Sequence, residues 1–348
     1  MTFGREKMIY PLIRPLLFKL DPEVAHRLTL NLVRLSGMIP PVDWALARFF
    51  QAQPKPVQAF GLQFKNPVGL AAGYDKDGVA LRGLSMLGFG HIELGTVTPR
   101  PQPGNPAPRL FRLAEDQGVI NRMGFPGRGA DYVARQLSPD ARRPRSIVVG
   151  VNLGKNKDTP LEQAAEDYTV LLRRFTPLAD YLAVNISSPN TPGLRSLQGR
   201  EMLEALLGAI AKERREIALG RGAHPPILVK LAPDLSDAEL DDAVGVILET
   251  GMDGIIATNT TLSREKLRSA HGHESGGLSG QPLTSLSDTV LSKVVKRAAG
   301  KVPVVGVGGI TCPDDARRKL DLGATLVQVY TGMIYAGPGL VKEIVQKI

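Results

Sequence analysis

This sequence predicts an α/β fold, a (β/α)8 TIM barrel with a small N-terminal helical extension, from three features of its pattern. Eight short runs rich in Val, Ile and Leu alternate with segments of helical period, and polar residues cluster where nearly every run ends. Apolar strands separated by helices are typical of a buried parallel sheet. Eight such units in roughly 280 residues match the size of a barrel. A doubly wound open sheet is the alternative, and the number of strands favours the barrel.

The elements follow one another regularly along the chain. The predicted strands are 67–72, 91–97, 146–152, 181–187, 227–232, 254–259, 302–307 and 325–330. The predicted helices lie near 77–88, 128–137, 159–176, 200–219, 236–250, 284–299, 313–322 and 338–347.

Two domains are expected, an N-terminal helical region at 1–50 and a barrel domain at 51–348. Pro54 and Pro56 mark the boundary between them. After it, two runs flank Gly61 and predict a small hairpin, 57–65, that closes the bottom of the barrel.

The N-terminal region has its own helical pattern. Asp21 followed by Pro22 is typical of a helix start, which predicts two helices at 8–20 and 22–36. The region contains seven basic and four acidic residues, and an apolar face with basic flanks suits the surface of an anionic membrane. A helical pair packed on the barrel explains the same period, and from period alone this interpretation is slightly favoured.

The first apolar segment, 8–20, is short and is interrupted by two charged residues and two prolines. A bilayer-spanning helix needs about 20 mostly apolar residues, and a signal peptide has an uncharged apolar core and a cleavage site. We therefore expect neither, and no transit peptide.

Charge and cysteine content narrow the possible partners and sites. The net charge is +9 and the pI about 9.6, which suits nucleic acid, an anionic membrane or acidic small molecules. Cys312 is the single cysteine, so a disulfide framework and a cysteine-ligated iron–sulfur cluster within the chain are excluded. A cytosolic or cytosol-facing location is the simplest interpretation. No His and Cys spacing suggests a metal site.

Several loops after the predicted strands contain residues suited to a ligand site. Lys230 lies in an apolar strand, where an ammonium is costly to bury without an anionic partner. Glycine-rich segments at 276–280, 306–309 and 330–332 stand where barrels of this type bind phosphate. Ser188 is a candidate base, but no histidine adjoins it in sequence. Taken alone, its segment is more typical of a proline-braced loop.

The long motifs of the chain resemble the class 2 dihydroorotate dehydrogenases, which are quinone-dependent and membrane-associated. The matching segments occur in the family's order: A-A-G-Y-D-K, T-P-R-P-Q-P-G-N-P-A-P-R-L-F-R, N-R-M-G-F, N-I-S-S-P-N-T-P-G-L-R, G-G-L-S-G-Q-P-L and G-V-G-G-I. The similarity runs from about residue 8 to the C-terminus. Tyr74 departs from the family, where Leu or Phe is more usual.

The resemblance implies the oxidation of dihydroorotate to orotate in pyrimidine biosynthesis. Ser188 would remove the C5 proton, FMN would accept hydride at N5 from C6, and a quinone would receive the electrons. The implied FMN contacts are Ala72, Gly73, Tyr74, Asp75, Lys76, Thr96, Asn152, Asn185, Lys230, Thr258, Gly280, Gly309, Tyr330 and Thr331. The implied substrate contacts are Lys76, Asn121, Arg122, Met123, Gly124, Phe125, Asn185, Asn190, Asn259 and Thr260.

The resemblance also implies a role for residues 1–50. They would bind the membrane and form a tunnel to the flavin for ubiquinone or menaquinone, with His26, Arg112 and Tyr330 along it. The family's properties favour a bacterial peripheral protein on the cytoplasmic face of the inner membrane.

Three other interpretations compete with this one. A soluble class 1 enzyme would use fumarate or NAD and would have Cys in place of Ser188. A tRNA dihydrouridine synthase would need an RNA-binding module and aromatic residues to stack bases, yet aromatics make up 5% of the chain, so no nucleic-acid partner is expected. A non-catalytic membrane-surface protein would not need both lysines and the asparagines.

Overall fold

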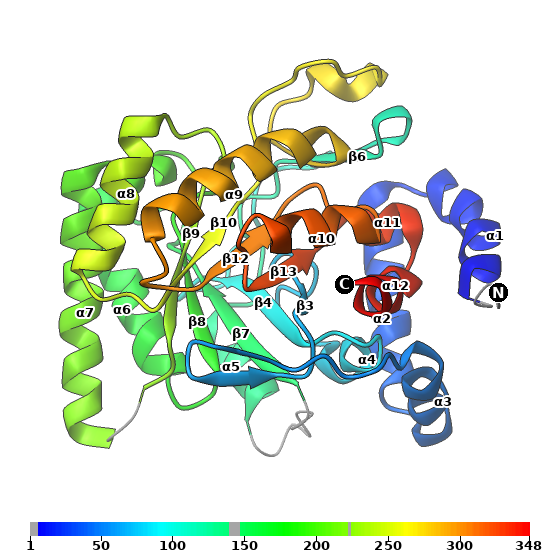
Figure 1. Ribbon diagram of the computed structural model, residues 1–348, viewed down its shortest axis with the longest axis horizontal. Coiled ribbons are helices and arrows are strands. Elements are labelled where there is room, and N and C mark those ends of the chain that lie inside the picture. Colours follow the sequence, from blue (N-terminus) through cyan, green and yellow to red (C-terminus); the bar gives the residue numbers. More distant parts are fainter. Residues whose placement is uncertain (1–5, 139–146, 222–223) are drawn as a thin grey trace.

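Eight parallel strands form a closed barrel in the computed structural model, which describes residues 6–138, 147–221 and 224–348 (Figure 1). The TIM-barrel prediction is therefore confirmed, although the start of the third predicted strand, Ser146, lies outside the described residues. The barrel strands are β3 (Val68–Leu70), β4 (His91–Val97), β7 (Val148–Leu153), β8 (Tyr181–Asn185), β9 (Ile227–Leu231), β10 (Gly254–Ala257), β12 (Val304–Val307) and β13 (Leu326–Val329).

The barrel closes where its last strand pairs with its first. β13 lies parallel to β3, with Val327 opposite Val68 and Val329 opposite Leu70. Nearly every residue of the eight strands is buried, which explains why the strands appear in the sequence as continuous apolar runs. Because all eight strands are parallel, their carboxyl ends meet at one rim.

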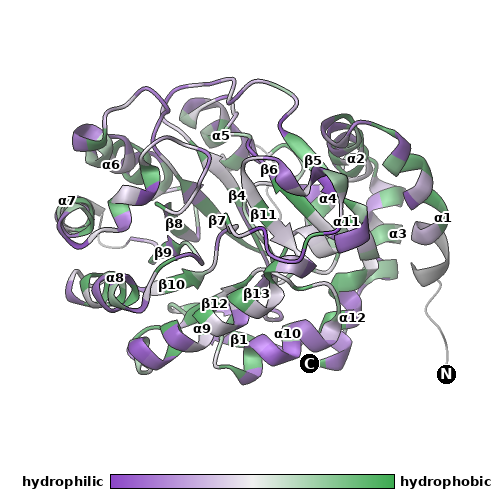
Figure 2. Cartoon of the chain, turned by 90° about the horizontal axis from the view of Figure 1, so that it is seen from above, coloured by the Kyte–Doolittle hydropathy of each residue, from purple (hydrophilic) through white to green (hydrophobic). Residues whose placement is uncertain are grey.

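Helices surround this barrel (Figure 2). They are α4 (Leu81–Ser85), α5 (Ala130–Leu137), α6 (Ala164–Phe175), α7 (Arg200–Arg221), α8 (Asp237–Glu249), α9 (Thr284–Ala298), α10 (Pro313–Asp321), α11 (Thr331–Ala336) and α12 (Gly339–Lys347). Short 3-10 turns span Ala114–Asp116, Leu161–Gln163, Leu194–Gln198, Ala270–His273 and Gln281–Leu283.

The first of these helices is shorter than predicted. The pattern suggested a helix near 77–88, but α4 contains only five residues. The buried carboxylate of Asp75 accepts hydrogen bonds from the backbone N–H groups of Val79 and Ala80, and Gly78 has φ +71°. These contacts hold the chain in a turn where the prediction placed the first helical turn.

Two small sheets complete the barrel domain. β1 (Val57–Ala59) and β2 (Leu62–Phe64) form the predicted hairpin, and Phe64 packs against His91 at the amino end of the barrel. The second sheet was not predicted. In it, β5 (Leu110–Leu113), β6 (Gly118–Asn121) and β11 (Gly277–Gly280) pair antiparallel. This sheet joins two loops that are far apart in sequence.

Three helices precede the hairpin. α1 (Glu6–Lys19) and α2 (Pro22–Ser36) match the two predicted helices, whereas α3 (Pro40–Phe50) was missed. Asp21 caps α2 by accepting from the N–H groups of Glu23 and Val24, as expected for an N-cap.

Two kinds of contact attach these helices to the barrel domain. A Cβ on Gly83 of α4 would lie 1.9 Å from the carbonyl oxygen of Val33 in α2, so the two helices touch backbone to backbone. Arg109 forms a two-pronged ion pair with Glu23, at 2.7 and 3.0 Å. Arg112 donates to the carbonyl oxygens of Leu17 and Leu20, which lie at the C-terminal end of α1.

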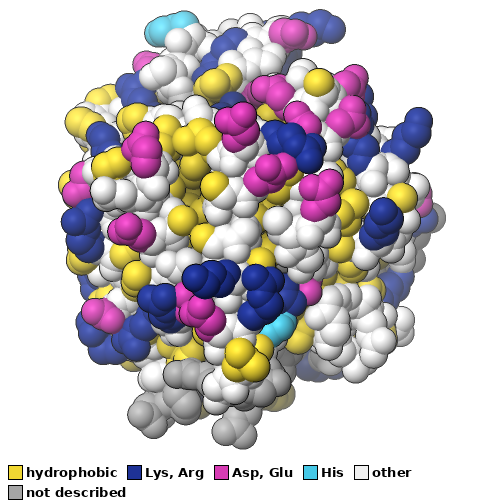
Figure 3. All heavy atoms as spheres, turned by 90° about the vertical axis from the view of Figure 1, so that its left-hand side faces the viewer, with side chains coloured by type: hydrophobic (Ala, Val, Ile, Leu, Met, Phe, Trp, Pro, Cys, Tyr) yellow, Lys and Arg dark blue, Asp and Glu magenta, His cyan; other side chains and the backbone are white. Residues whose placement is uncertain are grey.

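The N-terminal helices leave a large apolar surface exposed. Its side chains are Leu12, Ile13, Leu16, Leu20, Val24, Leu28, Leu32, Leu35, Met38, Ile39, Val42 and Trp44. Within the described ranges, no helix is both long enough and apolar enough to cross a bilayer. The side of the molecule that contains α7 and α8, seen in Figure 3, instead mixes positive and negative side chains.

Candidate active site

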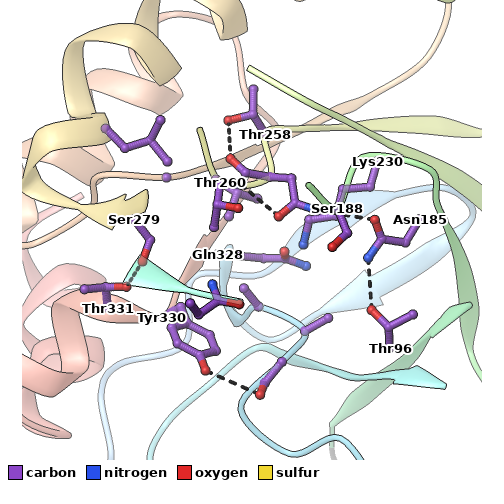
Figure 4. Close-up of a pocket in the computed structure, with 18 of the residues that line it drawn as sticks. Thr96, Asn185, Ser188, Lys230, Thr258, Thr260, Ser279, Gln328, Tyr330 and Thr331 are labelled. Carbon is purple, nitrogen blue, oxygen red and sulfur yellow. Dashed lines mark hydrogen bonds between the residues drawn. The ribbon is translucent and has the colours of Figure 1, made fainter. Parts of the chain in front are cut away.

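A cavity opens at the carboxyl rim of the barrel, where loops after many strands converge. Its empty space, including the mouth, amounts to about 990 Å³, which is ample for a cofactor and a small substrate. Most predicted site residues line it: Ala72, Gly73, Lys76, Thr96, Asn121, Met123, Gly124, Phe125, Asn185, Ser188, Asn190, Lys230, Thr258, Asn259, Thr260, Gly280, Gly309, Tyr330 and Thr331. Figure 4 shows ten of the lining residues labelled.

Four predicted contacts lie outside this lining. The carboxylate of Asp75 instead stabilises the turn before α4. Arg122 pairs with Glu274 at 2.6 Å, and its guanidinium lies over the ring of Phe111. The ring of Tyr74 meets that of His26 edge to face, at 5.1 Å between centroids. The fourth residue, Asn152, lies behind the cavity wall.

A chain of hydrogen bonds orients the polar wall of the cavity. Asn152 accepts from the Thr96 hydroxyl at 2.5 Å and from the Asn185 amide at 3.0 Å. Asn185 also donates to Thr96 Oγ1 at 2.9 Å. Because this triad satisfies itself inside the protein, it holds the side chains of Thr96 and Asn185 at the cavity in fixed orientations.

Ser188 lies in the loop that follows β8 and is only 5% exposed. The one hydrogen bond described for its hydroxyl comes from the backbone N–H of Asn190, at 3.3 Å. That donor favours negative charge on the oxygen. No histidine or carboxylate hydrogen-bonds to Ser188 within the part of the chain that the structure describes.

Arg195 holds the Ser188 loop in place. Its guanidinium donates to the carbonyl oxygen of Ser187 at 3.0 Å and to that of Thr260 at 2.8 Å, and it pairs with Asp234 at 2.7 Å. The fork geometry of arginine suits such a three-way contact. The sequence motif contains Arg195, but sequence reasoning assigned it no role.

Lys76 is the second lysine at the cavity, on the side nearest α2. Burial lowers the pKa of its ammonium group to about 8, and Glu23 partly opposes this shift. Its Nζ donates to the carbonyl oxygen of Gly73. The charge of Lys76 is therefore available at neutral pH for an anionic ligand.

Sequence reasoning also missed Gln328 and Ser279, which line the cavity. Gln328 is the only polar residue in the apolar strand β13, and the same property of Lys230 in its own strand marked that lysine as a candidate site residue. Its Oε1 is buried and has no hydrogen-bond partner within the described residues. An acceptor of this kind matches a donor on a bound ring.

A second cavity lies between the N-terminal helices and the barrel. Its lining is mostly apolar and includes Tyr10, Phe18, Ala25, Val33 and Met333, with about 1270 Å³ of empty space including the mouth. The three residues predicted for a quinone tunnel, His26, Arg112 and Tyr330, all line it. Burial lowers the pKa of His26 to about 4, so its ring is neutral at physiological pH.

Tyr330 lines both cavities and separates them. Its hydroxyl lies 3.4 Å from the carbonyl oxygen of Gly73 on the rim side. Its ring lies 6.2 Å from that of Tyr74, which belongs to the second cavity. A polar site and an apolar site thus share one aromatic side chain in their linings.

Comparison with known proteins agrees with this arrangement. The family model described as "Dihydroorotate dehydrogenase" matches residues 56–348. The chain belongs to the dihydroorotate dehydrogenase family. A relative from Shewanella sp. (strain W3-18-1), named "Dihydroorotate dehydrogenase (quinone)", is 48% identical over 97% of this chain and 98% of its own length. Another of the same name, from Anaeromyxobacter sp. (strain Fw109-5), is 52% identical over 97% of this chain and 91% of its own.

Solved structures of the dihydroorotate dehydrogenase family share the fold. The ferulenol complex of DHODH from Eimeria tenella aligns with a TM-score of 0.84 at 39% identity, covering 95% of this chain and 93% of that one. The ligand-free form aligns with a TM-score of 0.85 at 41% identity, covering 94% of each chain. The prediction of the quinone-dependent class 2 is confirmed by the named relatives.

Dihydroorotate dehydrogenases of this class are FMN-dependent, and the rim cavity fits that cofactor. Gly280 and Gly309 have φ of +89° and +71°, so the backbone adopts turns at the cavity that favour glycine and that suit a phosphate group. Lys230 offers a cation, while Thr96, Asn185 and Gln328 offer donors and acceptors for the edge of a flavin ring. The described residues contain no cluster of His, Cys, Asp and Glu that could hold a metal.

The pKa of Lys76 generates a prediction about ligand binding. An anion held by its ammonium group should bind with constant affinity below pH 8 and lose about tenfold per pH unit above it, as the lysine loses its proton. Titration of the yellow protein with orotate, followed by flavin absorbance between pH 6.5 and 9, measures this. Lys76→Met should bind weakly with a flat profile. If the variant keeps the slope, another group is responsible.

Proposed function

We infer that this chain oxidises dihydroorotate to orotate in pyrimidine biosynthesis, with FMN as cofactor and a quinone as electron acceptor. The observation that best supports the inference is the pair of cavities. One is polar and contains a serine, two lysines and a set of amides, the other is apolar, and Tyr330 separates them. A water-soluble acid and a lipid-soluble quinone need two such environments.

In this proposal Ser188 is the base that takes the C5 proton of dihydroorotate. The Asn190 N–H stabilises negative charge on its oxygen, and Arg195 keeps the loop closed against the cavity. When bound in this cavity, FMN would supply the acceptor, N5, for the hydride that leaves C6 of the substrate. The substrate's carboxylate and ring amides meet Lys76, Asn121, Met123, Gly124, Phe125, Asn185, Asn190, Asn259 and Thr260, with Arg122 supporting the loop from outside.

The glycine turns and the polar wall would hold the flavin. Lys230 would meet its pyrimidine part, where the ammonium group would stabilise the negative charge that reduction adds. Its other contacts are Ala72, Gly73, Lys76, Thr96, Asn185, Thr258, Gly280, Gly309, Tyr330 and Thr331. Asn152 acts through the two side chains it orients, and Tyr74 and Asp75 shape the loop.

The quinone occupies the second cavity, which makes residues 1–50 the quinone-tunnel region and residues 51–348 the catalytic domain. His26 is neutral and can hydrogen-bond a quinone oxygen, and Arg112 holds the end of α1. Tyr330, which lines both cavities, would lie between the flavin and the quinone.

The exposed apolar surface of α1–α3 binds the membrane, which makes the protein peripheral on the cytoplasmic face of a bacterial inner membrane. A surface of this size is unusual on a soluble protein, and it adjoins the cavity that a quinone must enter from lipid. The mixed charges on the α7 and α8 side offer no single-sign patch for nucleic acid (Figure 3).

Replacing Ser188 with Ala tests the base. Reduction of the flavin by dihydroorotate in stopped flow should slow by about 10²–10⁴-fold, the usual contribution of a general base, while FMN stays bound. Ser85→Ala, a change in α4 away from the cavity, should leave the rate unaltered. Unchanged reduction in Ser188→Ala would remove Ser188 from the mechanism, and no reduction in the parent protein would refute the substrate.

Replacing Ala25 with Phe tests the quinone site, because Ala25 is buried at the wall of the second cavity. The larger ring should fill the space and slow reoxidation of the flavin by a soluble quinone analogue at least tenfold, without changing reduction by dihydroorotate. Leu28→Phe, on the exposed side of the same helix, is the matched control. Equal reoxidation rates in all three proteins would place the quinone elsewhere.

Replacing Leu16 with Asp tests the membrane surface. Leu16 is 63% exposed on α1 and does not line the cavity. Burying one leucine in lipid contributes about 1.5–3 kcal/mol, so binding to anionic phospholipid vesicles should weaken at least tenfold in co-sedimentation. Leu219→Asp, on α7, makes the same chemical change at an exposed leucine and should bind like the parent. Equal losses would indicate a general charge effect.

A further inference from the structure

A buried ion pair crosses the inside of the barrel below the rim cavity. Lys230 Nζ lies 3.7 Å from Glu93 Oε1, and the two side chains are 6% and 0% exposed. Lys230 lines the cavity, whereas Glu93, on β4, does not. Lys230 at the cavity is therefore paired with a carboxylate that does not line the cavity.

Three neutral groups hold the Glu93 carboxylate in place. Asn152 donates to Oε1 at 2.8 Å, while Gln328 and the Tyr181 hydroxyl donate to Oε2 at 2.9 and 3.0 Å. A carboxylate that receives three donated hydrogen bonds and a lysine contact is stabilised as an anion. The charge next to Lys230 is thus built into the barrel.

The polar neighbours of this carboxylate contribute no second negative charge. Tyr181 is fully enclosed, and burial, followed by the nearby Glu93, raises the pKa of its hydroxyl well above the usual value. His91 is also enclosed, and burial lowers its pKa to about 3, so its ring is neutral. Among the described residues, the polar cluster around Glu93 therefore contains one cation, Lys230, and one anion, Glu93. The low dielectric constant of the barrel interior screens these charges poorly.

The ion pair of Lys230 and Glu93 is better suited to set the charge beside the cavity than to stabilise the fold. A buried ion pair contributes little net stability, because desolvation offsets the attraction between its members. The three neutral donors to Glu93 come from three other barrel strands, Asn152 from β7, Tyr181 from β8 and Gln328 from β13. The arrangement fixes both the position of the Lys230 ammonium and the amount of its charge that remains uncompensated.

We propose that Glu93 is a positioning residue for the flavin reaction: it holds the Lys230 ammonium in place beside the cofactor and offsets part of its charge, and so sets the reduction potential of the bound flavin. This inference rests on the proposed contact between Lys230 and the flavin. Reduction adds negative charge to the ring. Lys230 therefore favours the reduced form and Glu93 opposes it.

The test compares the flavin reduction potentials of the parent and four variants, all loaded with FMN, by anaerobic equilibration with redox dyes, using a reductant other than dihydroorotate. Glu93→Gln should raise the equilibrium constant for reduction at least tenfold, about 30 mV for a two-electron couple. Lys230→Gln should lower it by a similar factor. The double variant, with no charge on either residue, should lie near the parent. Tyr181→Phe, which removes a neutral donor to the same carboxylate, should stay within threefold of the parent.

Each outcome has a distinct meaning. A potential in Glu93→Gln at or below that of the parent overturns the role of Glu93, provided that Lys230→Gln shifts. An unchanged potential in Lys230→Gln overturns the flavin contact of Lys230 itself, which belongs to the proposed function. If Glu93→Gln alone fails to fold or to bind FMN, the double variant against Lys230→Gln decides the matter. The double variant must be the more easily reduced of the two, and equal potentials overturn the proposal.

Discussion

Closure of the parallel strand ladder is the constraint on which the rest of the structure depends. Once β13 pairs with β3, all eight strands end at one rim, and residues from Ala71 to Gly332 line one cavity although they are spread over most of the chain. Closure also creates a narrow interior in which a buried charge must find its partners inside the barrel. The ion pair of Glu93 and Lys230, with its neutral donors, meets that requirement directly beneath the ligand site. The position of the site and its electrostatic character thus have the same origin.

The N-terminal helices depend on the barrel in turn. They leave many apolar side chains exposed, and their place is determined by a few specific contacts: the backbone contact at Gly83, the ion pair of Arg109 with Glu23, and Arg112 at the end of α1. Both arginines come from the long loop and sheet that cover the rim. The same loop therefore shapes the polar cavity on one side and positions the apolar cavity on the other.

Much of this could be predicted from the sequence, because burial on both faces makes a parallel strand an unbroken apolar run. All eight barrel strands were predicted from such runs. The hairpin was predicted from the two runs around Gly61, and two of the three N-terminal helices from their helical period. Most predicted site residues line the cavity. Two features depend on contacts between distant segments and escaped prediction: the sheet of β5, β6 and β11 joins strands more than 150 residues apart, and Tyr74 turns toward His26. The short α4 also escaped prediction, because it depends on hydrogen bonds from Val79 and Ala80 to the nearby carboxylate of Asp75. Gln328 could have been noticed, because it is the lone polar residue in an apolar strand, as Lys230 is, and Glu93 is the one acidic residue in its own strand.

Because Tyr330 lines both cavities, both sites should limit which substitutions this position tolerates. An inhibitor lodged in the apolar cavity would press on a side chain that the polar cavity also needs. Escape from such a compound by changing Tyr330 would carry a penalty in flavin binding or turnover. Resistance substitutions are therefore expected in α1 and α2, where Ile13, Ala25 and Leu32 line the apolar cavity but not the polar one. Natural variation should follow the same rule, so the lipid-facing pocket is free to diverge between lineages while its inner wall stays constant.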